Sequence, residues 1–175
     1  GDAALAAIKE HLKSWPRDAM AFAPATSVFG LIGFCGRVGR EKEQLAMIEP
    51  FEKDYGDDWW YRTQLAFAQI ELGQFGVGEH NIERALAAYP RSAHAAHIRG
   101  HLFYEIGERE AGLRFLNDWM KDYPRDGLMH CHNSWHRALW SLETGRRADA
   151  WRIYDESLRP GAAWGPQVNV ATDCP

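Results

Sequence analysis

Two landmarks recur together at a constant spacing, and this periodicity restricts the fold more than any other feature of the chain. Tyr89-Pro90-Arg91 and Tyr123-Pro124-Arg125 lie 34 residues apart, and so do Gly73 and Gly107. This is the period of tetratricopeptide repeats, each of which is a pair of antiparallel helices. Glycine adopts the positive φ that turns one helix into the next, and the residue before a proline is displaced from the helical region. The spacing therefore predicts an all-α fold, an α-α superhelix of antiparallel helix pairs.

The segments between the landmarks carry apolar residues every three or four positions, which is typical of helices that bury one face. Gly78, Gly112 and Ala150 stand early in the predicted second helices, where a small side chain lets two helices approach closely. Pro24 lies well inside one N-terminal helix, so we expect a bend or a break there. The tail beyond residue 160 has little periodic pattern. The predicted helices are Ala3–Trp15, Asp18–Cys35, Arg40–Tyr55, Asp58–Gly73, Gln74–Tyr89, Ser92–Gly107, Arg109–Tyr123, Asp126–Thr144 and Arg147–Leu158.

Composition argues against several classes of protein. The formal net charge is -4 without a basic block, which does not favour a nucleic-acid or membrane partner. No apolar run is long enough to span a bilayer. The cysteines Cys35, Cys131 and Cys174 are few and widely spaced, which argues against a disulfide framework or a zinc ribbon. We therefore expect a soluble, cytoplasmic protein with a single repeat domain over residues 1–175, cut from a longer polypeptide.

Histidine is concentrated in one part of the chain. Six of the eight histidines lie between His94 and His136. His97 and His101 are four residues apart and share a helix face, and His132 and His136 repeat this spacing in the next first helix. The first helices of a tetratricopeptide array line its concave groove, so we expect both pairs to point into one groove. The candidate ligand-binding residues are His97, His101, His132, Asn133, Trp135, His136, Tyr104 and Trp60.

Three interpretations of the histidines remain open from the sequence. Paired imidazoles can hold Zn²⁺, Ni²⁺ or Fe²⁺, although the segment from His97 to His101 lacks the glutamate that serves as the base of a zinc metalloprotease helix. A metal-free acid/base site is the second, because clustered histidines lower one another's pKa. The third is structural hydrogen bonding between helices. Cys131 lies beside His132, but adjacent residues on a helix point in different directions and cannot pair as nucleophile and base.

The segment His132-Asn133-Ser134-Trp135-His136-Arg137-Ala138-Leu139 resembles the His-Asn-x-Trp-His-x-Ala-Leu motif of the tetratricopeptide repeat protein 38-like family. The resemblance extends over almost the whole chain. It implies the same repeat fold, but little about activity, because the family's biochemical role is poorly defined. The other positions that match the family's pattern are His97, His101, Phe67, Glu71, Glu79, Tyr154, Asp155 and Asp173.

Two positions depart from the family's pattern. Thr26 stands where the family has a histidine in an early helix, and Tyr104 stands where it has a glutamate, with Glu105 displaced by one residue. One residue along a helix is a rotation of about 100°. If these two groups belong to a family site, this chain has altered part of that site.

The expected function is a binding scaffold that presents a histidine-rich concave groove to a protein, a peptide or a small ligand. The alternative is an enzyme or small-molecule binder that uses His97, His101, His132 and His136, with or without a metal. A scaffold predicts an open groove with the histidines scattered or packed between helices. An enzyme predicts that the four histidines converge on one enclosed pocket, with the C-terminal segment folding over it as a lid. A third alternative is that activity lies elsewhere in a longer polypeptide. Catalytic residues and cofactors stay unassigned by the sequence.

Overall fold

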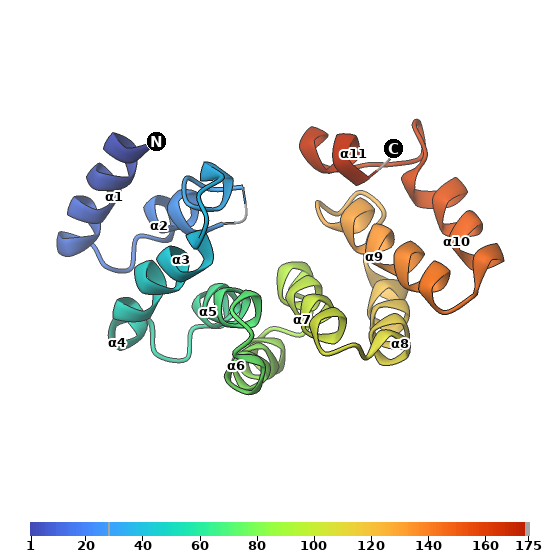
Figure 1. The fold of residues 1–175 in the computed structure, drawn as a ribbon, viewed down its shortest axis with the longest axis horizontal. Helices are drawn as coiled ribbons and strands as arrows, with labels where there is room; N and C mark the ends of the chain where they lie inside the picture. Colours follow the sequence, from blue (N-terminus) through green and yellow to red (C-terminus); the bar gives the residue numbers. More distant parts are fainter. Residues whose placement is uncertain (28, 174–175) are drawn as a thin grey trace. The chain divides into compact units, whose positions relative to one another are not determined.

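The computed structural model describes residues 1–27 and 29–173, and every regular element in that part of the chain is helical (Figure 1). The chain divides into two compact units, Gly1–Tyr89 and Pro90–Pro175. Helices that follow one another in sequence pack in pairs within each unit. This confirms the predicted all-α class, with the pairing that an α-α superhelix requires. A single domain stays a prediction, and Cys174 lies outside the described residues.

The N-terminal unit is built around an aromatic core. Phe22, Tyr55 and Tyr61 are buried there, and the Tyr61 hydroxyl donates to the carbonyl of Ile48 over 3.1 Å. The carboxylate of Asp58 accepts from the two backbone N–H groups of residues 60 and 61, which fixes the start of the next helix. The helices of this unit are α1 (Asp2–Ser14), α2 (Ala19–Thr26), α3 (Arg40–Ile48), α4 (Glu52–Tyr55), α5 (Trp59–Glu71) and α6 (Phe75–Ala88).

The C-terminal unit is arranged around one helix, α9. This helix packs against α8, α10 and α11, which surround it in Figure 1. A π-helical turn over Tyr154–Leu158 continues α10 and also contacts α9. The helices of this unit are α7 (Ala93–Glu105), α8 (Arg109–Trp119), α9 (His130–Glu143), α10 (Arg147–Ile153) and α11 (Gln167–Asp173).

The glycine landmarks form the turns inside two helix pairs. Gly73 has φ 74° and Gly107 has φ 77°. After Gly107 the backbone N–H of Glu108 bonds to the carbonyl of Phe103, which satisfies the end of α7. A side chain is strained at such a φ, so the periodic glycines have the role that the sequence predicted.

The small residues early in the second helices are also required by close packing. A Cβ atom built on Gly112 would lie 2.8 Å from the ring of Trp140 and 2.9 Å from Cβ of Phe103. A Cβ atom on Gly78 would lie 2.7 Å from Cγ1 of Ile70. All three distances are too short for real carbon atoms, so these two positions set how closely the helices can approach.

The predicted helix Asp18–Cys35 is shorter than expected. The Asp18 carboxylate caps it by accepting from two backbone N–H groups, but α2 runs through Pro24 and ends at Thr26. The carbonyl of Pro24 then accepts from the backbone N–H of Leu31, so the chain folds back on the helix end. The predicted break therefore falls two residues after the proline, at the end of α2.

Helix α9 begins at His130 instead of Asp126. The ring of Tyr123 lies over Gly127, where a Cβ atom would come within 2.4 Å of it. The Tyr123 hydroxyl accepts from the backbone N–H of Met129 over 3.3 Å. This packing holds the residues just before His130 in turns. The periodic pattern of apolar residues did not reveal this later start of α9.

The tail after Pro160 contains a helix that the sequence analysis missed. Pro166 precedes α11, and its carbonyl accepts from the backbone N–H of Val170 over 3.0 Å. A proline at the start of a helix is a favourable signal that could have located this element. In the described residues, no helix is long and apolar enough to cross a membrane.

The close packing at Gly78 can be tested within a single helix. We expect Gly78→Ala to lower the free energy of unfolding by roughly 1–3 kcal/mol, because the new methyl group overlaps Ile70. Gly76→Ala, two residues earlier on α6 and in open space, is expected to leave it unchanged or to raise it by up to ~1 kcal/mol. Urea unfolding of both variants measures the difference. Equal effects would show that helix propensity, and not packing, decides the stability at these positions.

Candidate functional site

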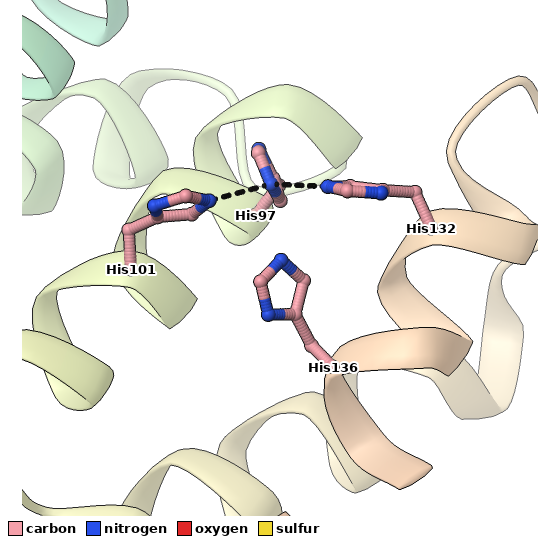
Figure 2. A group of neighbouring side chains, drawn as sticks. All are labelled: His97, His101, His132 and His136. Atoms are coloured by element: carbon pink, nitrogen blue, oxygen red, sulfur yellow. Dashed lines mark hydrogen bonds between the residues drawn. The ribbon is translucent and has the colours of Figure 1, made fainter. Parts of the chain in front are cut away.

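The histidine cluster is formed by two helices of the C-terminal unit. His97 and His101 lie one turn apart on α7, and His132 and His136 lie one turn apart on α9. The hydroxyl of Ser92 caps α7 by accepting from the backbone N–H of Ala95, which fixes the register of the first pair. Figure 2 shows the four rings turned toward one another from the two helices. The convergence expected of an enclosed site is therefore present in the structure.

The ring nitrogens of the cluster are very close together. Nε2 of His97 lies 2.9 Å from Nε2 of His101 and 2.9 Å from Nε2 of His132. The ring centroid of His136 lies 5.1 Å from the ring centroids of His97 and His101, and 4.9 Å from that of His132. One nitrogen from each of the four rings lies within 4.8 Å of every other. The four nitrogens thus enclose a space the size of a single atom.

Burial favours the neutral form of two rings of the cluster, those of His97 and His136. His97 is 4% exposed and His136 is 7% exposed. Burial, reinforced by the neighbouring imidazoles, lowers the pKa of both rings well below the ordinary value of histidine. Burial also lowers the pKa of His94, whose ring lies 6.0 Å from that of His97, to about 4. Neutral imidazoles each keep one nitrogen lone pair, which is the form that binds a metal.

Asp173 fixes the orientation of one ring. Its Oδ2 atom lies 2.7 Å from Nδ1 of His132, on the side of the ring that faces away from the cluster. A carboxylate can only accept, so Nδ1 carries the proton and Nε2 of a neutral His132 presents a lone pair. This residue was matched in the sequence only through the family resemblance, because α11 itself was not predicted.

Hydrogen bonding alone does not satisfy the cluster. Nε2 of His97 has either one proton or one lone pair, yet it faces two nitrogens at 2.9 Å. Nε2 of His136 is buried, points at the other three rings and has no hydrogen-bond partner in the described residues. Nδ1 of His97 is also buried without a partner in that part of the chain. Buried polar atoms that lack a partner are costly, so Nε2 of His136 and the shared Nε2 of His97 favour a further group at the centre, although such a group would not satisfy Nδ1 of His97.

The other predicted site residues have different surroundings. Trp135 stacks on His132 with ring centroids 5.6 Å apart, and Asn133 is fully buried with an amide that has no partner in the described residues. Tyr104 is 47% exposed at the end of α7, outside the buried cluster. Trp60 belongs to the N-terminal unit, where its ring contacts Phe22 and Tyr55.

Three further residues that the sequence singled out have structural surroundings. The ring of His130 stacks on Tyr123, with centroids 6.5 Å apart. Cys131 is buried in an apolar cluster with Ala138 and Ile153. Thr26, where the sequence departs from the pattern of the family that it resembles, lies in the N-terminal unit and donates to the carbonyl of Phe22 over 3.1 Å.

Comparison with known proteins gives a partial similarity. The chain is 27% identical over 109 residues to the Protein CTR9 homolog of Arabidopsis thaliana. The matched residues make up 62% of this chain but 10% of that relative. No family model matches the chain, and no solved structure matches it. The helix pairing and this similarity support tetratricopeptide-like helical repeats, while membership of the tetratricopeptide repeat protein 38-like family stays a prediction.

The buried histidines predict acid sensitivity of the metal-free protein. In the unfolded chain these rings take up protons near their ordinary pKa of 6.5, whereas His94 in the folded protein does so only at about 4. The unfolded state therefore binds more protons between about pH 6.5 and about pH 4, so we expect the free energy of unfolding to fall by roughly 1–3 kcal/mol as the pH drops through this window.

Urea unfolding with a chelator present, followed by tryptophan fluorescence at several pH values, measures this loss. His94→Gln should flatten the pH dependence, and His80→Gln, an exposed position on α6, should leave it unchanged. If the free energy of unfolding depends on pH equally in the wild type, His94→Gln and His80→Gln, the lowered pKa of His94 is not the cause of the acid sensitivity.

Proposed function

We propose that the C-terminal unit binds a divalent transition metal through Nε2 of His97, His101, His132 and His136. The observation that carries this proposal is the convergence of four imidazole nitrogens within 4.8 Å, including the buried and unpartnered Nε2 of His136. A central ion accepts a lone pair from each ring at once. It thereby replaces a hydrogen-bond pattern in which one His97 nitrogen would have to serve two neighbours.

The size of the cluster supports an ion at its centre. In a tetrahedral zinc site with bonds of about 2.0–2.1 Å, neighbouring ligand nitrogens lie ~3.3–3.4 Å apart. The contacts at 2.9 Å are slightly shorter, and all four nitrogens lie within 4.8 Å of one another. Metal binding would require the side chains to shift until each nitrogen–nitrogen distance approaches the tetrahedral value.

The ligand atoms restrict the choice of metal. Imidazole nitrogen is a good ligand for Zn²⁺, Ni²⁺, Cu²⁺ and Fe²⁺, whereas Mg²⁺ and Ca²⁺ require oxygen ligands. Cys131, the nearest thiol in sequence, packs in the apolar cluster with Ala138 and Ile153. We therefore assign the centre to a first-row transition ion held by nitrogen alone.

A protein partner is a second proposal, at the level of the repeat fold. Stacked helix pairs present extended surfaces, and such surfaces commonly bind peptides or protein domains. The partial similarity to the Protein CTR9 homolog accords with a repeat scaffold. The four histidines, however, turn toward one another instead of lining an open groove, so they favour an enclosed metal centre over direct contact with a peptide. Placement in the cytoplasm likewise stays a proposal.

Metal analysis tests the proposal directly. Untagged protein, purified without a chelator, is expected to contain about one transition-metal ion per chain by inductively coupled plasma mass spectrometry. Metal-free protein should bind Zn²⁺, Ni²⁺ or Co²⁺, each titrated alone, and should gain about 2.7 kcal/mol of stability at one hundred times the dissociation constant.

Substitutions of single histidines supply the matched control. His97→Gln and His136→Gln should weaken metal binding and reduce the stabilisation, because each removes one of the four ligand nitrogens. His130→Gln changes a histidine on the same α9 that stacks on Tyr123 instead, and it should bind metal like the wild type. A wild-type protein that contains no metal, and whose thermal stability no added ion changes, would refute the proposal.

A further inference from the structure

The C-terminal helix α11 places a carboxylate behind the histidine cluster. Asp173 is 5% exposed, and its Oδ2 atom lies 2.7 Å from Nδ1 of His132. Its other oxygen, Oδ1, accepts from the hydroxyl of Thr172 over 3.1 Å. The His132 ring therefore lies between this carboxylate and Nε2 of His97. The His132 ring thus contacts α11 through Nδ1 and the centre of the cluster through Nε2.

Helix α11 depends on α9 for its stability. It has seven residues, and helices shorter than ~12–15 residues are marginal in water by themselves. Val170 packs on the apolar cluster around Cys131 and Leu158, and Asn169 is buried as well. Asp173 adds a charged hydrogen bond to this apolar contact. The docked position of α11 is thus held by one apolar residue and one carboxylate on the same side of the helix.

We propose that Asp173 is a positioning residue of the metal centre, and that its hydrogen bond to His132 couples the docking of α11 to metal binding. This inference rests on the proposed function. A carboxylate behind a metal-bound imidazole fixes the tautomer and orientation of the ring and raises its basicity. Asp173 does this for His132 from a helix that is otherwise weakly held.

The charge of the ion explains why a carboxylate is buried here. A buried carboxylate is costly unless an opposite charge or several hydrogen bonds compensate it. The ring of His132 and the hydroxyl of Thr172 each supply a hydrogen bond to this carboxylate. A divalent ion on the far nitrogen of the same ring would add a positive charge. By thermodynamic linkage, the free energy by which the docked α11 strengthens metal binding equals the free energy by which the bound ion stabilises the docking of α11.

The test compares two substitutions that remove the same charge. Asp173→Asn keeps the shape of the side chain but removes the charge behind His132. Asp149→Asn removes a charge from α10 in the same unit, where the carboxylate is half exposed and accepts from Arg152 over 2.9 Å. Zn²⁺ affinity is measured by competition with a chelating dye, and the visible spectrum of the Co²⁺ form reports the coordination geometry.

We expect Asp173→Asn to weaken Zn²⁺ binding by about 10- to 100-fold and to change the Co²⁺ spectrum, whereas Asp149→Asn should match the wild type in both. Hydrogen exchange of the α11 amides gives a second measurement, which can be made on the wild type alone. In the wild type these amides should exchange more slowly when Zn²⁺ is added. In Asp173→Asn, added Zn²⁺ should give no such protection.

The outcomes separate this inference from the proposed function. If the wild type binds no metal, both are overturned together. If the wild type binds Zn²⁺ but Asp173→Asn has the same affinity and the same Co²⁺ spectrum, only the positioning role of Asp173 is overturned. If α11 exchanges at the same rate with and without Zn²⁺, the coupling between docking and metal binding is overturned, whatever the affinities are.

Discussion

The contact of Trp140 with two glycines is the interaction on which the C-terminal unit depends. Trp140 lies on α9, and its ring fills the space left by Gly112 on α8 and lies against Gly100 on α7. One buried indole on α9 therefore contacts two other helices, α7 and α8. His101 follows Gly100 directly, and His136 precedes Trp140 by one turn. The same contact that packs the helices brings the two histidine pairs close enough to meet.

The parts of the fold that were predictable from the sequence are those set by local chemistry. Gly73 and Gly107 revealed the helix turns because a positive φ strongly favours glycine, and Gly78 and Gly112 revealed the close approaches because no other residue fits. The spacing of His132 and His136 gave the right face of α9 because a helix has a fixed period. These features need no knowledge of the tertiary structure.

The features that escaped prediction depend on contacts between distant parts of the chain. The start of α9 is decided by the ring of Tyr123 over Gly127, and α11 is held by α9 instead of by its own propensity. Trp60 was assigned to the histidine face from its place in a first helix. Its ring contacts Phe22 and Tyr55 within the N-terminal unit, and its role in a ligand site stays a prediction. Whether two helical faces converge depends on the rotation between successive helix pairs, which no single helix encodes.

The contact between His97 and His132 joins the first helices of successive pairs, 35 residues apart along the chain. In a linear array each pair is held only by its neighbours, so single helices can open one at a time. The proposed ion, shared by α7 and α9 with α11 attached through Asp173, would remove these independent steps. The C-terminal unit would then open as one cooperative block, and a chaperone or protease acting on it would meet a switch-like transition instead of a gradual one.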